Sequence, residues 1–167
     1  VMLVDDQNLV REGIKSLLKL AGHIEIVGEA SDGEEALAKI DEYAPEVVLM
    51  DIRMPKLDGI ATLKRLKELG NETPVIILTT FDDHELVLNG IRAGARGFLL
   101  KDVSLESLVE AIDAVSRGAV HHLLVHGAGR GHCADAIDRA DFRAGRRRHR
   151  PRPPDDRRRR NRRRRNR

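Results

Sequence analysis

The fold is decided by residues 47–55, Val47-Val48-Leu49-Met50-Asp51-Ile52-Arg53-Met54-Pro55. Four aliphatic residues in succession are followed by a single aspartate, and a proline closes the segment. A short, continuous apolar run bounded by turn-forming residues is typical of a strand that is buried on both faces of a parallel sheet. The stretch therefore predicts a central strand with Asp51 at its carboxyl end.

Four further apolar runs lie on either side of this stretch. They are residues 1–4, residues 24–27 with Ile24, Ile26 and Val27, residues 75–78 and residues 98–100. The segments between the runs carry apolar residues every three or four positions, which is typical of amphipathic helices. Five repeats of a strand followed by a helix predict an α/β fold, a doubly wound five-stranded parallel sheet with helices on both faces.

Capping residues indicate where the helices begin and end. Asp58 and Ser104 are predicted N-caps, and glycines follow the last turns at positions 22, 70 and 118. The predicted apolar faces are Leu9, Val10, Ile14, Leu17, Leu18 and Ala21 in the first helix, Ala36, Leu37 and Ile40 in the second, and Leu63, Leu66 and Leu69 in the third. The helix at 83–93 is the weakest, because Gly90 in its middle costs about 1 kcal/mol relative to alanine.

Polar side chains end four of the five predicted strands. They are Asp5-Asp6, Asp51, Thr79-Thr80 and Lys101-Asp102, whereas the second strand ends in Glu29-Ala30. Ligands of open α/β sheets bind at the carboxyl ends of the strands. Taken singly, each of these residues is more often a helix cap or a solvated surface residue, so only their convergence on one edge favours a functional site.

Three carboxylates at one edge of a sheet need a cation. At an effective dielectric constant of ~20, two like charges about 4 Å apart cost about 4 kcal/mol. Oxygen ligands at an edge open to water suit Mg²⁺ better than a soft metal. A carboxylate beside Mg²⁺ and the ammonium of Lys101 can attack a phosphoryl group and form an acyl phosphate.

Four motifs, in order, resemble the receiver domain of bacterial two-component response regulators over residues 1–118. They are Leu3-Val4-Asp5-Asp6, then residues 48–55 with Asp58-Gly59, then Leu78-Thr79-Thr80, then Gly97-Phe98-Leu99-Leu100-Lys101-Asp102. The resemblance implies a flavodoxin-like sheet with strand order 2-1-3-4-5. It also implies a switch that a sensor histidine kinase phosphorylates, and that catalyses only its own phosphorylation and dephosphorylation.

The resemblance also implies a role for each polar residue. Asp51 is the implied phosphoacceptor. The implied Mg²⁺ ligands are Asp5, Asp6, Asp51 and the backbone carbonyl of Arg53, with Asp6 favoured over Asp5 as a direct ligand. Phosphate binding and switching are implied for Thr79, Thr80, Lys101 and Phe98, and a plain core position is the alternative for Phe98.

The implied switching surface is residues 83–117, and a homodimer through the receiver is an implied assembly. Residues 93–102 resemble the LuxR/NarL-type subfamily, whose output is a helix-turn-helix DNA-binding domain. Beyond residue 118 the sequence contains neither the Leu-Thr-x-Arg-Glu start of that domain nor a recognition helix. DNA is therefore an expected partner only if an output domain exists or if the basic tail binds it.

Charge divides the chain sharply. Residues 1–120 have a net charge of −9, whereas residues 121–167 have a net charge of +12 with 17 arginines. We predict a receiver domain at 1–118 and an irregular, disordered Arg-rich tail at 119–167. We favour a frame-shifted replacement of the linker and DNA-binding domain, because the tail lacks the Ser, Glu, Lys and Gln that ordinary disordered tails contain.

Alternatives stay open for both parts of the chain. The tail could be a basic arm at 146–167 that binds nucleic-acid phosphates. It could also hold a metal through His121, His122, His126, His132 and Cys133, although their spacing fits no zinc pattern. For the domain, the alternative is a phosphatase or hydrolase that uses the same acidic edge.

Composition indicates where the protein works. A single cysteine excludes an intrachain disulfide and favours a reducing compartment. No apolar run approaches the ~20 residues of a membrane span. The apolar start at residues 1–4 leads directly into Asp5, so we expect no signal peptide and a cytoplasmic protein.

Overall fold

The computed structural model describes residues 1–80 and 84–122. The chain divides into two compact units, residues 1–129 and 130–167, and every described residue lies in the first. In chain order the elements are β1 (Met2–Val4), α1 (Asn8–Ala21), β2 (Gly28–Ala30), α2 (Gly33–Tyr43), β3 (Val48–Asp51), α3 (Gly59–Glu68), β4 (Val75–Thr79), α4 (His84–Ala93), β5 (Gly97–Leu100), α5 (Leu105–Ser116) and β6 (His121–His122).

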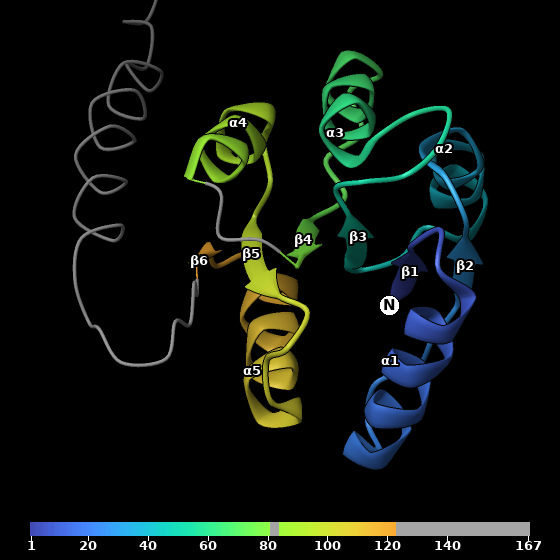
Figure 1. Ribbon diagram of the computed structural model, residues 1–167, viewed down its shortest axis with the longest axis vertical. Coiled ribbons are helices and arrows are strands. Elements are labelled where there is room, and N and C mark those ends of the chain that lie inside the picture. The colour runs from blue at the N-terminus through green and yellow to red at the C-terminus, as the bar shows by residue number, and fades with distance from the viewer. Residues whose placement is uncertain (81–83, 123–167) are drawn as a thin grey trace, which may run out of the picture. The chain divides into compact units, whose positions relative to one another are not determined.

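All strands are parallel and lie in the order β2-β1-β3-β4-β5-β6. Figure 1 shows α2, α3 and α4 on one face of the sheet and α1 and α5 on the other. The predicted doubly wound sheet with the order 2-1-3-4-5 is thus confirmed. The structure adds the two-residue β6 beside β5, in a part of the chain where the sequence predicted no regular element.

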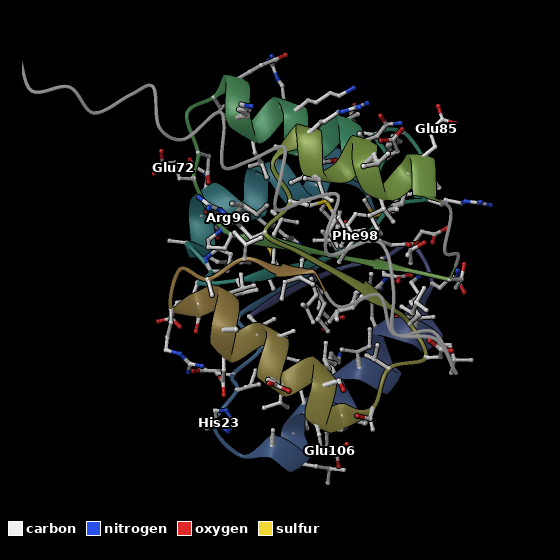
Figure 2. The ribbon with its side chains drawn as sticks, turned by 90° about the vertical axis from the view of Figure 1, so that its left-hand side faces the viewer. His23, Glu72, Glu85, Arg96, Phe98 and Glu106 are labelled. Atoms are coloured by element: carbon white, nitrogen blue, oxygen red, sulfur yellow. The ribbon has the colours of Figure 1, made fainter. Side chains whose placement is uncertain are left out.

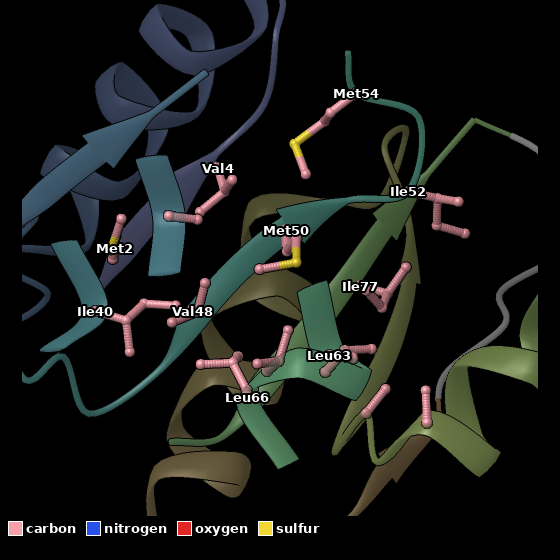
Figure 3. Packing of buried hydrophobic residues seen from close by; sticks show 14 of the residues in the cluster. Met2, Val4, Ile40, Val48, Met50, Ile52, Met54, Leu63, Leu66 and Ile77 are labelled. Atoms are coloured by element: carbon pink, nitrogen blue, oxygen red, sulfur yellow. The ribbon is translucent and has the colours of Figure 1, made fainter. Parts of the chain in front are cut away.

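The apolar runs fill two cores, one on each face of the sheet. In β3, Val48 and Met50 are buried among residues of α2, α3 and α4, and Figure 3 shows Met50 in this cluster. Leu49 is buried on the other face, among residues of α1 and α5. Because helices cover both faces, β3 and β4 are apolar up to their last residues, Asp51 and Thr79, and the two-residue alternation of a half-exposed strand is absent.

The predicted N-caps are confirmed. The carboxylate of Asp58 accepts a hydrogen bond from the backbone N–H of Ala61 at 2.7 Å, and the hydroxyl of Ser104 accepts one from Ser107 at 3.2 Å. Gly22 ends α1 with a φ of 74°, a left-handed conformation that glycine adopts without steric cost.

The predicted end of the second strand in Glu29-Ala30 is confirmed, but the apolar run at residues 24–27 lies outside the strand, because β2 comprises Gly28–Ala30. The parallel register places Gly28 opposite Met2. A Cβ atom on Gly28 would lie 2.6 Å from the ring of Tyr43, so glycine fits where α2 closes over the edge strand. Ile24 and Ile26 instead pack against the core from the preceding loop. Their apolarity reflects burial and not strand pairing.

Two predicted apolar helix faces are too wide. Leu9 is 85% exposed and Leu69 is 62% exposed. Leu9 precedes the buried Leu18 by nine residues, which at about 100° per residue puts it on the opposite side of α1. Leu69 is the C-cap residue of α3 and lies beyond the last turn.

The glycine in the middle of α4 has a packing role. A Cβ atom on Gly90 would lie 2.5 Å from the ring of Phe98, which is fully buried beneath α4 (Figure 2). The residue that weakens this helix therefore makes room for an aromatic ring of the sheet.

Some predictions fall outside the described residues. These are the first residue of the predicted helix at 83–93, the predicted disordered tail from residue 123 onward with its basic arm at 146–167, and the metal ligands His126, His132 and Cys133. Among the described residues, no helix is both long and apolar enough to cross a bilayer.

Candidate functional site

Three carboxylates gather at the carboxyl edge of the sheet. Asp5 and Asp6 follow β1, and Asp51 is the last residue of the neighbouring β3. One oxygen from each of the three side chains lies within 4.8 Å of the others. Asp5 and Asp51 are buried, whereas Asp6 is exposed. The structure thus places one carboxylate of the cluster at the solvent side and two beneath it.

Lys101 neutralises part of this cluster. It follows β5, and its Nζ lies 2.7 Å from Oδ2 of Asp5 and 3.0 Å from Oδ2 of Asp51. Its backbone N–H donates to the carbonyl of Thr79 at 2.8 Å, which fixes the start of the loop after β5. The lysine side chain is only 11% exposed, so water screens this charge contact weakly.

The environment shifts the pKa of two of these groups. Burial raises the pKa of Asp51 above its ordinary value, although contact with Lys101 opposes the shift. Burial alone would lower the pKa of Lys101, but its contacts with Asp5 and Asp51 outweigh burial, and the pKa is raised. Lys101 is therefore a permanent cation beside a carboxylate that is costly to ionise.

Backbone donors orient both buried carboxylates. Oδ1 of Asp5 accepts from the N–H of Gln7 at 2.9 Å, and Oδ1 of Asp51 accepts from the N–H of Ile52 at 2.8 Å. Oδ2 of Asp5 is buried and lies 2.7 Å from the ammonium of Lys101. The all-oxygen set of the three carboxylates fits a hard divalent cation such as Mg²⁺.

The remaining predicted site residues are Arg53, Thr79, Thr80 and Phe98, which lie either near Asp51 in the chain or in, or next to, the strands β4 and β5. Arg53 lies two residues beyond Asp51, in the loop before α3. Thr79 is the buried last residue of β4, next to Leu78, which pairs with Asp51. Thr80 is exposed, and Phe98 is buried within β5. The roles of these four residues stay predictions.

Glycines shape the loop that carries the phosphoacceptor candidate. A Cβ atom on Gly59 would collide with the backbone carbonyl oxygen of Asp51, so only glycine allows α3 to start against the end of β3. The N–H of Gly59 donates to the carbonyl of Ile52 at 2.9 Å. Asp58-Gly59 was part of the sequence motif, but this close approach was not foreseen.

A third buried carboxylate near this edge, Asp32, was not predicted from the sequence. It follows β2, accepts from the N–H of Glu35 at 2.9 Å and pairs with Lys56 at 2.7 Å. The hydrogen bond from Glu35 and the contact with Lys56 lower its pKa. The Lys56 contact ties the loop after β3 to the start of α2. The signal for it was the Ser31-Asp32-Gly33 sequence after the second strand.

Comparisons with known proteins agree with this geometry. The family model for the response regulator receiver domain matches residues 1–113. The transcriptional regulatory protein YdfI of Bacillus subtilis is 44% identical over 120 residues, which are 72% of this chain and 56% of YdfI. The nitrate/nitrite response regulator protein NarL of Escherichia coli is 33% identical over 118 residues, 71% of this chain and 55% of NarL.

A solved structure shows the same fold. The signal receiver domain of the putative response regulator NarL from Mycobacterium tuberculosis superposes with a TM-score of 0.67 at 36% identity, covering 70% of this chain and 94% of that one. The chain spans about half the length of the curated relatives it matches. The family match, the relatives and the shared fold together show that this chain belongs to the response regulator receiver domain family.

Proposed function

We propose that the chain is the phosphoacceptor of a two-component signalling system, and that a sensor histidine kinase phosphorylates Asp51. The observation that carries the proposal is the contact of Lys101 with both Asp5 and Asp51 at a buried sheet edge. Receiver domains are not an enzyme family in the ordinary sense. The chemistry we propose is limited to phosphorylation and dephosphorylation of the chain itself.

The residues present support a transfer of the phosphoryl group to Asp51. One of its carboxylate oxygens forms a bond to phosphorus, while the P–N bond of the donor phosphohistidine breaks and the imidazole nitrogen keeps the electron pair. Lys101 balances the added negative charge from a fixed position. Mg²⁺ would be held by Asp5, Asp6, Asp51 and the Arg53 carbonyl, and when bound it would neutralise charge on the phosphoryl oxygens.

The switch we propose begins at the same edge. The hydroxyls of Thr79 and Thr80 would bind the phosphoryl oxygens. This binding would draw the end of β4 toward Asp51. Phe98 lies in the adjacent strand and packs beneath α4. A movement of Thr79 would therefore alter the packing of residues 83–117. This switching surface would then bind its protein partners differently.

The wider setting follows from the relatives. YdfI is named a transcriptional regulatory protein and NarL a response regulator protein, and the matched segment covers 56% of the first and 55% of the second. We infer a cytoplasmic receiver at 1–118, with a histidine kinase and a second receiver as partners. DNA is a partner only where an output domain exists or the tail at 119–167 binds it.

The direct test is phosphorylation with a small donor. The full chain is incubated with acetyl phosphate and MgCl₂ and weighed by intact mass spectrometry. We expect one added phosphoryl group, its loss in EDTA, and its absence in Asp51→Asn. The matched control is Asp41→Asn, which removes an exposed aspartate of α2 and should be phosphorylated normally.

Two results would count against the proposal. One is the absence of a mass gain in the unaltered chain, and the other is an equal gain in Asp51→Asn. Sustained release of phosphate from a small phosphomonoester at a catalytic rate would instead favour a hydrolase that uses the same edge.

A further inference from the structure

A groove of about 520 Å³ lies between α3 and α4, away from the carboxyl edge of the sheet. It is lined by Lys64, Lys67, Glu68, Asn89, Arg92 and Ala93. Figures 1 and 2 both show these two helices side by side on the same face of the sheet. The groove shares no lining residue with the Asp51 site, so what it binds is a separate question.

The two walls of the groove are built in the same way. On α3, Lys64 and Lys67 are three residues apart, and on α4 Asn89 and Arg92 are also three apart. Residues with this spacing lie one above the other on the same helix face. Ala93 is buried at the base, where its small side chain leaves the groove open. Donors therefore face one another from two neighbouring helices.

The cations of the groove are uncompensated. Within the described part of the chain, Lys64, Lys67 and Arg92 make no ion pair and no side-chain hydrogen bond. The one acid of the groove, Glu68, is already paired with Arg65 at 2.9 Å. Other basic side chains of the domain do form ion pairs with acidic residues. They are Arg11, Lys15, Lys39, Lys56 and Lys101.

This positive groove lies in a domain of the opposite charge, since residues 1–120 have a net charge of −9. A long polyanion such as a nucleic acid would meet the surrounding negative surface as well as the groove, and the surrounding charge would repel it. A short acidic segment carries its charge only where the groove lies. Charge complementarity thus favours a protein segment.

A second hollow extends the groove toward the amino ends of the strands. It has a volume of about 250 Å³, shares Lys67 and Ala93 with the first, and includes Arg96 and Glu72, which Figure 2 labels near the same end of the sheet. Arg96 also has no ion pair among the described residues. A ligand several residues long could therefore follow the cations from one hollow into the next.

We propose that the α3–α4 groove is a docking site for an acidic segment of a partner protein, whose carboxylates pair with Lys64, Lys67 and Arg92. A helical segment with glutamates three and four residues apart would match the spacing of the cations on α3. The proposal does not require phosphorylation of Asp51, so its failure would leave that function untouched.

The test uses an alanine-rich peptide with glutamates spaced three and four residues apart. Its ends are acetylated and amidated, so that only the glutamates carry charge. The ¹⁵N-labelled full chain is titrated with it and amide shifts are followed by NMR. We expect saturable shifts at Lys64, Asn89 and Ala93. The double variant Lys64→Glu/Arg92→Glu should bind at least about tenfold more weakly at these amides, a loss of about 1.4 kcal/mol.

The matched control is Lys19→Glu/Arg117→Glu, which makes the same change of charge at two exposed residues on the other helix layer. It should bind like the unaltered chain, and because the arginine-rich tail is identical in all three proteins, its own attraction for the peptide cancels. Thermal melts of both double variants check that the fold is intact.

Three outcomes would overturn the proposal. The first is equal binding by the two double variants, or shifts confined to the tail. The second is a DNA duplex that shifts the same groove amides and loses this effect in Lys64→Glu/Arg92→Glu, which would identify a nucleic acid as the occupant. The third is a shift of the groove amides with protein concentration alone, which would identify a second copy of the chain.

Discussion

Two groups of ion pairs in this domain have nearly the same distances and very different surroundings. At the carboxyl edge, Lys101 lies 2.7 Å from Asp5 and 3.0 Å from Asp51, and the three side chains are 11%, 4% and 7% exposed. On α2, Lys39 lies 2.7 Å from Glu35, and these two side chains are 31% and 37% exposed. Distance alone does not tell a reactive charge cluster from a helix-surface pair, whereas burial does.

The balance of charge differs as well. At the edge, one lysine faces two buried carboxylates and an exposed third, so negative charge remains in excess. On α2, Glu35 is supported by Lys39 and by the N–H and hydroxyl of Ser31. The first cluster keeps an excess of negative charge until a cation binds, and the second is complete as it stands.

The largest expected effect comes from removing the lysine of the edge. Lys101→Ala leaves two buried carboxylates facing each other, and we expect the free energy of unfolding to fall by about 3 kcal/mol at pH 7. Urea unfolding in EDTA measures the loss. MgCl₂ should restore part of it, because a bound cation stabilises the folded state that holds it.

The matched variant for this test is Lys39→Ala, which should cost at most about 1 kcal/mol. Mg²⁺ should not change that cost, since Lys39 lies on α2 and contacts Glu35 and the carbonyl of Glu29. Equal losses in the two variants would erase the distinction between the buried and the exposed pairs.

Removal of the Asp51 charge should stabilise the domain, whereas removal of Lys101 should destabilise it. Burial raises the pKa of Asp51, so between its ordinary and its raised pKa the folded state binds more protons than the unfolded state. The stability of the unaltered chain therefore falls as pH rises through that window. Asp51→Asn removes the buried charge, and we expect it to increase the free energy of unfolding at pH 7 by an amount on the order of 1 kcal/mol.

Urea unfolding from pH 4 to pH 8 tests this prediction. The gain from Asp51→Asn should be small at the acidic end and grow with pH, whereas Asp41→Asn should stay within about 0.5 kcal/mol throughout. A variant that is destabilised at pH 7 would mean that Lys101 outweighs burial at this residue.

The site was predictable because topology and chemistry point to the same edge. Parallel strands end on one side of the sheet, so recognising the strands is enough to predict that Asp5, Asp51 and Lys101 converge. The structure brings these residues within contact distance. The helices with clear caps, such as those at Asp58 and Ser104, were predictable because a cap is a local interaction.

The rest depends on contacts between segments that are distant in sequence. In β2, a Cβ atom on Gly28 would lie 2.6 Å from the ring of Tyr43 of α2, and no local sequence pattern shows this contact. Gly90 suggests a weak helix by itself and finds its reason only in the ring of Phe98. The cations of the α3–α4 groove are likewise unremarkable in sequence, since their lack of partners appears only when the helices are placed side by side.

A smaller effect is expected at the exposed pair of α2. Contacts with Lys39 first, and then with Ser31, lower the pKa of Glu35 to about 2. A lowered pKa of a carboxyl group contributes stability that is fully present above its ordinary pKa and is lost as pH falls toward 2. Because solvent screens this residue, we expect Glu35→Gln to cost only about 1 kcal/mol at pH 7.

Urea unfolding at pH 7 and at pH 3 measures this difference, which should shrink at the lower pH. Glu34→Gln is the matched control, because this neighbouring side chain is exposed. A cost that is the same at both pH values would show that Glu35 acts through its hydrogen bonds to Ser31 and not through its charge.

The smallest change in stability should come from Glu68→Gln, which breaks the exposed pair with Arg65 on α3. Pairs at this spacing contribute at most about 0.5 kcal/mol, so urea unfolding should barely change. Among the described residues that line the α3–α4 groove, Glu68 is the only acid, so Glu68→Gln removes that negative charge and frees Arg65. The affinity of the groove for the acidic peptide should therefore rise. Glu12→Gln breaks the equally spaced pair with Lys15 on α1 and should leave that affinity unchanged. A higher affinity in Glu68→Gln alone would show that this surface pair matters little for folding and yet limits what the groove binds. Equal affinities in Glu68→Gln and Glu12→Gln would show that Arg65 and Glu68 play no part in docking.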